Sequence, residues 1–154
     1  MTQVHPGPVA AAIPATMIQA LIDHARAGVP DEACGLIVGD RPAAAGGRAL
    51  RWEPVRNAAA SAYRYEIHPD DLYRLTVATD DADEVFWGIV HSHTHTPAVP
   101  SPTDIGLAFY PDALYILVSL AEDEEDVGTA LPSVRAWRIV DGAVHEVALD
   151  VVEG

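Results

Sequence analysis

Two histidines and one aspartate in the middle of the chain have the types and the spacing of a metal site. His91 and His93 follow an apolar run, and residues i and i+2 of a strand point to the same face of a sheet. Ser101 precedes a proline and is typical of a helix N-cap, so Asp104 is expected in the first turn of a helix. A catalytic zinc ion takes three protein ligands and keeps one position open for water. These three side chains therefore predict a Zn²⁺ site.

The same residues also have interpretations that need no metal. A lone histidine on an apolar strand is most often a core residue whose hydrogen bonds are satisfied. An acid three residues after a serine N-cap, as Asp104 is, forms a capping box. His95 would share the face of the other two histidines only if the strand continued, and Pro97 is expected to end it. The residues alone leave a metal centre and a structural cluster open.

Composition limits the partners of this chain. The 154 residues carry 9 basic and 23 acidic side chains, a formal net charge of −14. Nucleic-acid binding needs cations that replace phosphate counterions, so we expect neither nucleic acid nor an anionic membrane as a partner. The single cysteine excludes an intrachain disulfide and favours a reducing cytoplasm. Neither a signal peptide nor an apolar run long enough for a membrane span is recognised.

Apolar periodicity predicts a single α/β (α+β) domain with one curved, mixed β-sheet flanked by helices. A lead-in or edge strand at 1–11 is expected before the domain at 12–152, and an acidic loop is expected at 121–132. We expect a two-residue hairpin turn at Asp141 and Gly142. Helices are predicted at 14–27, from residue 68 onward and at 101–109. Strands are predicted at 33–39, 49–55, 63–67, 85–93, 113–120, 133–140 and 143–151.

The central segment resembles the signature of the JAMM/MPN+ family of zinc isopeptidases. That signature is His-x-His, seven residues, serine, two residues and aspartate, which His91, His93, Ser101 and Asp104 match in full. The family also has a glutamate some tens of residues upstream, beside an apolar strand that contains glycine. Glu32 is the matching residue here. The resemblance covers about residues 12–152.

This resemblance implies a fold and a set of roles. The fold is the JAMM/MPN (cytidine-deaminase-like) fold, and the activity is amide hydrolysis by activated water. His91, His93 and Asp104 would hold Zn²⁺. Glu32 would act as general base and acid, and the hydroxyl of Ser101 would stabilise the oxyanion. If Ser101 faces the site, we expect backbone groups to satisfy the helix end.

Further residues resemble one branch of the family, small bacterial peptidases that remove a C-terminal cysteine from a ubiquitin-like sulfur-carrier protein. Asn57, Tyr65, Ile67, Pro69 and Asp71 are similar to the middle segment of the family, and 111–119 and 138–142 are similar to this branch. Thr94 and His95 depart from the family pattern, since many members have proline and a small residue there. No long insertion of the kind used by linkage-selective members is present, which argues against a polyubiquitin substrate.

The resemblance implies a ubiquitin-like sulfur-carrier protein as partner, with its extended tail added as a strand to a sheet edge. The expected edges are near 63–67 and the loop 94–100. Cys34 is interpreted as a buried structural thiol rather than a nucleophile. Two alternatives remain: a non-catalytic MPN-type scaffold, and a deubiquitinase-like isopeptidase with another ubiquitin-like substrate. A metal phosphoesterase would need further His and Asp clusters, which the sequence lacks.

Overall fold

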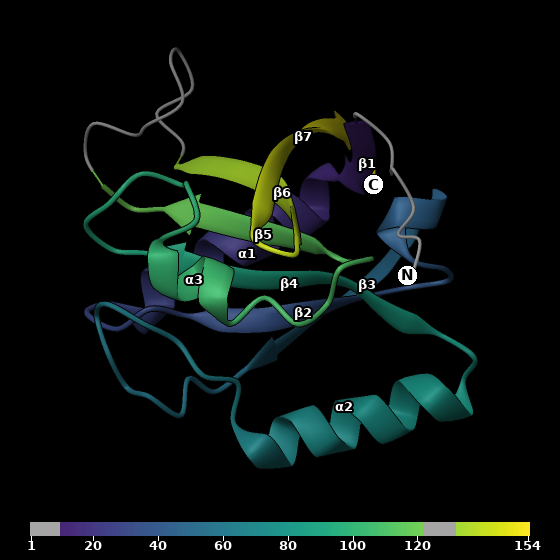
Figure 1. Ribbon diagram of the computed structural model, residues 1–154, viewed down its shortest axis with the longest axis horizontal. Helices are drawn as coiled ribbons and strands as arrows, with labels where there is room; N and C mark the ends of the chain where they lie inside the picture. Colours follow the sequence, from purple (N-terminus) through teal and green to yellow (C-terminus); the bar gives the residue numbers. More distant parts are fainter. Residues whose placement is uncertain (1–9, 122–131) are drawn as a thin grey trace.

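The computed structural model of this chain describes residues 10–121 and 132–154. Within these ranges the chain forms one domain with a curved sheet and three α-helices (Figure 1). The helices are α1 (Ala15–Gly28), α2 (Pro69–Asp81) and α3 (Pro102–Gly106). The strands are β1 (Ala10–Pro14), β2 (Cys34–Gly39), β3 (Ala49–Val55), β4 (Val85–His93), β5 (Leu114–Ser119), β6 (Ser133–Val140) and β7 (Ala143–Val152).

In the described part of the chain, the sheet is mixed and has seven strands in the order β1-β7-β6-β5-β4-β2-β3. Two pairs, β4–β5 and β1–β7, are parallel, and the other pairs are antiparallel. Residues 94–113, which include α3, join the parallel strands β4 and β5, as a parallel connection must cross over the sheet. The predicted α/β class with a curved mixed sheet is confirmed, and β4 lies between two buried neighbours.

Side chains on the two faces of the sheet form two apolar layers. Helix α1 packs on one face, where Leu21 and Ile22 contact buried residues such as Val90 and Val118. Helices α2 and α3 contribute Leu75 and Ile105 to the layer on the other face. Figure 1 shows α1 and α3 on opposite sides of the central strands. None of the helices in the described ranges is long and apolar enough to cross a membrane.

The prediction of a strand at 63–67 is wrong. Only an isolated bridge between Asn57 and Ile67 forms there. The side chain of Asn57 donates to the carbonyl of Arg64 and accepts from the N–H of Glu66. An asparagine side chain that bonds to nearby backbone competes with a strand ladder for the same groups, so this segment is a loop.

Other element boundaries also differ from the prediction. Helix α3 ends at Gly106 instead of residue 109, because glycine has a low helix propensity and the helix is only five residues long. At the N-terminus, Ala10–Pro14 is an edge strand that pairs with β7, and the helix begins at Ala15. The hairpin turn is confirmed, with positive φ at Asp141 and Gly142. Residues 1–9 of the expected lead-in 1–11 and residues 122–131 of the expected acidic loop lie outside the described residues.

The close packing of β2 yields a stability prediction. A Cβ at Gly35 would lie 2.8 Å from the carbonyl oxygen of Glu53 and would collide with the ring of Trp52. Gly35→Ala should therefore lower the free energy of unfolding by about 1–3 kcal/mol, measured by urea denaturation. Gly106→Ala is the matched control, because a Cβ there meets nothing within 4 Å and alanine favours helix. A loss no larger at Gly35 than at Gly106 would contradict this packing argument.

Candidate metal centre

The register of three strands brings the predicted site residues to one end of the sheet. His91 lies opposite Cys34 of β2, and His93 lies opposite Ser119 of β5. Because β2 and β4 are antiparallel, β2 begins where β4 ends, and Glu32 precedes β2 by two residues. The crossover that follows β4 starts α3 at this same end. Ligand sites in open α/β sheets typically form outside the carboxyl ends of the strands.

The three predicted metal ligands meet in a buried cluster. Nε2 of His93 lies 3.0 Å from Oδ2 of Asp104, and Nε2 of His91 lies 3.2 Å from the same oxygen. The two Nε2 atoms are 3.3 Å apart. All three side chains are buried, and one ligand atom from each lies within 4.8 Å of the others. These residues could therefore hold a metal ion.

Second interactions orient two of the three side chains. Nδ1 of His93 lies 2.7 Å from the carbonyl oxygen of Pro97. A carbonyl only accepts hydrogen bonds, so Nδ1 carries a proton, and in the neutral imidazole Nε2 is the nitrogen that has the lone pair. The carboxylate of Asp104 is held by the backbone N–H of Ser101, which donates to Oδ2 at 2.9 Å. Such partners commonly fix the orientation of metal ligands.

The donor set fits a divalent cation. The Nε2 atoms of His93 and His91 converge on a carboxylate oxygen of Asp104, and each of these nitrogens can offer a lone pair to a cation once its imidazole is neutral. A single cation at their common point satisfies all three atoms. Zinc prefers imidazole and carboxylate ligands at about 2.0–2.2 Å, and tetrahedral angles would then separate two ligand atoms by about 3.3–3.6 Å. The observed separations of 3.0–3.3 Å lie at and just below the lower end of that range.

Burial and the hydrogen bonds within the cluster shift the pKa values of its three side chains. Burial raises the pKa of Asp104, but the hydrogen bonds with His91 and His93 outweigh it and hold that pKa well below its usual range. Burial lowers the pKa of His91. Burial also lowers the pKa of His93, yet its hydrogen bonds to Asp104 and to Pro97 reverse the direction, so the net pKa is raised. An ionised carboxylate thus faces one imidazole that stays neutral.

Glu32 is buried close enough to this cluster for the charges of His93 and Asp104 to act on its carboxyl. Its side chain is buried, and Oε1 has no hydrogen-bond partner among the described residues. Burial raises the pKa of Glu32 from 4.5 to about 7, with smaller and opposite effects from the charges of His93 and Asp104. A carboxyl with a pKa near neutrality can take up and release a proton at working pH.

Ser101 is the N-cap of α3, and its Oγ accepts from the N–H of Asp104 at 3.1 Å in a complete capping box. The capping role weighed for Ser101 is therefore present, and its side chain contributes to the helix end. A hydroxyl has two acceptor lone pairs and one O–H donor. Capping occupies an acceptor position only, so the O–H of Ser101 is still able to donate.

The sequence predicted no role for two residues, Ser92 and Asn57, that hold the segment around Glu32 in place. Ser92 Oγ accepts from the N–H of Ala33 at 2.8 Å, and Ser92 N–H donates to the carbonyl of Ala33 at 2.9 Å. Asn57 Nδ2 donates to the carbonyl of Glu32 at 2.9 Å. Together they hold the segment with Glu32 against β4. The only sequence signal for Ser92 is a small polar residue inside an apolar strand.

Two further residues are not part of the ligand group. His95 is exposed and lies near the ring of Tyr63, with ring centroids 6.0 Å apart. Cys34 is buried as predicted, and burial raises the pKa of its thiol to about 12, which disfavours a nucleophilic thiolate.

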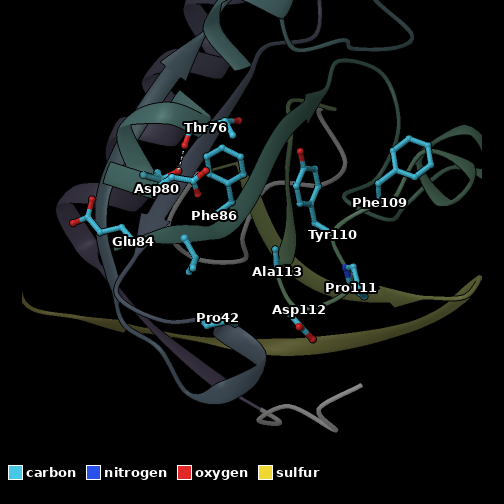
Figure 2. A pocket seen from close by; sticks show the side chains of 12 residues that line it. Pro42, Thr76, Asp80, Glu84, Phe86, Phe109, Tyr110, Pro111, Asp112 and Ala113 are labelled. Atoms are coloured by element: carbon cyan, nitrogen blue, oxygen red, sulfur yellow. Dashed lines mark hydrogen bonds between the residues drawn. The ribbon is translucent and has the colours of Figure 1, made fainter. Parts of the chain in front are cut away.

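A separate hollow of about 390 Å³ lies between α2, the start of β4 and residues 109–113. Figure 2 shows the rings of Phe86 and Tyr110 in its wall, with Asp80 nearby; these two ring centroids are 5.8 Å apart. None of the residues lining this hollow is a predicted site residue. The candidate chemistry is therefore confined to the end of β4.

Comparison with known proteins identifies the family. Residues 14–140 match Prok-JAB, the prokaryotic homologs of the JAB domain, and this chain belongs to that family. The chain is 41% identical over 145 residues to the CysO-cysteine peptidase of Mycobacterium tuberculosis, covering 92% of this chain and 90% of that protein. It is 34% identical over 104 residues to the desampylase of Haloferax volcanii, covering 64% of this chain and 73% of that protein.

Solved structures share the fold. A solution structure of a Desulfitobacterium hafniense protein superposes with a TM-score of 0.77 at 28% identity and covers 94% of both chains. The crystal structure of a JAB1/MPN domain protein from Archaeoglobus fulgidus superposes with a TM-score of 0.56 at 16% identity, covering 92% of this chain and 98% of that one. The predicted JAMM/MPN fold is therefore confirmed.

The raised pKa of Glu32 predicts a pH-dependent stability difference. The pKa of Glu32 is about 7 in the folded state and 4.5 in the unfolded state. Between these two pH values the folded state binds more protons than the unfolded state, so the stability of the wild type falls as the pH rises from 4.5 to about 7. Glu32→Gln removes this loss. In chelator, the variant should be more stable by on the order of 1–3 kcal/mol near pH 8 and by much less near pH 5. Thermal unfolding at both pH values measures this, and an equal gain at both would contradict it.

The buried hydrogen bond between Ser92 and Ala33 yields a stability prediction. Ser92→Ala leaves the N–H of Ala33 without its side-chain acceptor, which should cost about 1–3 kcal/mol in urea denaturation. Faster amide exchange at Ala33 should accompany it. Ser61→Ala is the control, since its hydroxyl accepts from an exposed N–H of Tyr63 and should change stability by about 0.5 kcal/mol or less. Equal effects of both substitutions would refute the role of Ser92.

Proposed function

We propose that this protein is a zinc-dependent peptidase that hydrolyses the amide bond after the C-terminal tail of a ubiquitin-like sulfur-carrier protein and releases cysteine. The observation that carries the proposal is the buried convergence of His91, His93 and Asp104 beside a buried carboxyl, Glu32. Similarity to a CysO-cysteine peptidase over most of both chains supports the reaction and the substrate class. The sole cysteine in the chain accords with action in the cytoplasm.

In this proposal His91, His93 and Asp104 hold Zn²⁺ through Nε2, Nε2 and a carboxylate oxygen. A bound zinc ion supplies Lewis-acid chemistry, which makes water more acidic and polarises a carbonyl. The protein keeps these ligands in place with the carbonyl of Pro97 and the N–H of Ser101. Burial excludes bulk water, so charges in the site act strongly on a substrate.

Glu32 moves the proton. Its carboxylate accepts a proton from the attacking water as the water oxygen bonds to the carbonyl carbon of the scissile amide. The same carboxyl then delivers that proton to the leaving nitrogen as the C–N bond breaks, so the products are a carboxylic acid and the free amine of cysteine. A pKa near 7 matches both halves of this transfer.

Ser101 stabilises charge on the substrate. Its O–H donates to the oxygen of the tetrahedral carbon while its lone pair caps α3. The rims of the site are the loop 57–67 and the loop 94–100, which the hydroxyl of Thr94 joins by donating to the carbonyl of Ala62 at 2.9 Å. We propose that the carrier tail lies along these rims.

The test is hydrolysis of a ubiquitin-like carrier protein extended by one C-terminal cysteine, followed by intact mass spectrometry. Wild type should remove one cysteine, a zinc chelator should stop the reaction, and added zinc should restore it. Glu32→Gln should lower kcat/KM by about a hundredfold or more, since general acid–base catalysis contributes on that scale. Glu153→Gln is the matched control and should retain wild-type activity, because Glu153 is exposed and lies outside both the cluster and the two rims.

The outcomes separate the alternatives. Wild-type rates in Glu32→Gln would remove Glu32 from the chemistry. A protein that binds no zinc and cleaves no carrier would be a scaffold of the same fold. Cleavage of an isopeptide-linked ubiquitin-like conjugate, but not of the cysteine adduct, would favour an isopeptidase; the similarity to a desampylase makes this the second candidate.

A further inference from the structure

The two candidate histidine ligands are oriented in different ways. Nδ1 of His93 bonds to the carbonyl of Pro97 at 2.7 Å. Nδ1 of His91 is buried and has no hydrogen-bond partner among the described residues. Metal-bound histidines almost always use this second nitrogen to set the ring orientation. Another contact must therefore orient the ring of His91.

Tyr65 makes that contact. Its ring stacks on the imidazole of His91, with centroids 4.2 Å apart and ring planes inclined by 18°. A stacked aromatic face limits rotation of the imidazole about its Cβ–Cγ bond, because a tilted ring would collide with its neighbour. The stack leaves the ring edge free, and Nε2 lies on that edge, 3.2 Å from Asp104.

The backbone on both sides of Tyr65 is clamped by one side chain. Asn57 Nδ2 donates to the carbonyl of Arg64 at 3.1 Å, and Asn57 Oδ1 accepts from the N–H of Glu66 at 2.9 Å. The same Nδ2 donates to the carbonyl of Glu32. The loop that carries Tyr65 is thus tied to the segment before β2, which carries Glu32, the proposed proton carrier.

We propose that Tyr65 is a positioning residue that orients His91 for metal binding by ring stacking, in place of the hydrogen bond that orients His93. This role rests on the metal centre of the proposed function. Tyr65 also lines an apolar hollow of about 310 Å³ with Ile67, Leu72 and Ile89. The ring of Tyr65 therefore lies between His91 and this hollow. The stack needs only the aromatic ring of Tyr65 and not its hydroxyl.

Zinc affinity, measured by competition with a chromophoric chelator, tests the role. Tyr65→Leu should weaken zinc binding about tenfold or more, the scale typical for residues that support metal ligands. Tyr65→Phe keeps the stacked face and should stay within about twofold of wild type. Tyr73→Leu is the matched control, since Tyr73 is 75% exposed on α2. The absorption spectrum of the Co²⁺-loaded protein should change in Tyr65→Leu alone.

Unchanged zinc affinity and an unchanged Co²⁺ spectrum in Tyr65→Leu would overturn the proposal. A second measurement needs no leucine variant and stands if that variant does not fold. In wild type and Tyr65→Phe, NMR should show the ring protons of His91 shifted upfield by the stacked ring; absence of this shift would also overturn it. A wild-type protein that binds no metal would refute the proposed function, while the NMR shift would still decide whether Tyr65 positions His91.

Discussion

A buried carboxylate that faces two buried imidazoles is the constraint on which this structure depends. Asp104, His91 and His93 bring three polar atoms within about 3 Å of one another at the end of an apolar sheet. Isolated charges are costly in such a place unless they are paired or bind a metal. The strands β2 and β5 on either side of β4 keep water away, and α3 supplies the carboxylate. The neighbouring structure serves to hold these atoms together.

Each candidate ligand is held by a different kind of interaction. A carbonyl sets the tautomer of His93, a capping box fixes the carboxylate of Asp104, and an aromatic face lies against His91. These supports come from the loop after β4, the start of α3 and the loop before α2. Packing and hydrogen bonds from supporting residues hold metal ligands in the right geometry before a metal ion binds. The site is therefore pre-organised by segments that are far apart in the sequence.

Glu32 shows the cost of such a site. A buried carboxyl oxygen without a hydrogen-bond partner among the described residues destabilises the folded state at neutral pH, and the same burial raises its pKa toward the range useful for proton transfer. Ser92 and Asn57 hold the backbone beside Glu32. The fold thus places an unfavourable group where chemistry can use it, as functional sites often do.

Local periodicity determined much of this protein in advance. Two histidines at i and i+2 and an aspartate three residues after Ser101 depend only on strand and helix geometry, so the cluster and the capping box were predictable. Only the tertiary structure decided that Ser92 accepts a hydrogen bond from the N–H of Ala33, which is 59 positions away in the sequence. It also decided that the side chain of Asn57 bonds to the backbone of residues 64 and 66, so that 63–67 is a loop and not a strand. The reason is physical: side chain-to-backbone bonds depend on which segments pack together, and residue periodicity carries no record of those neighbours.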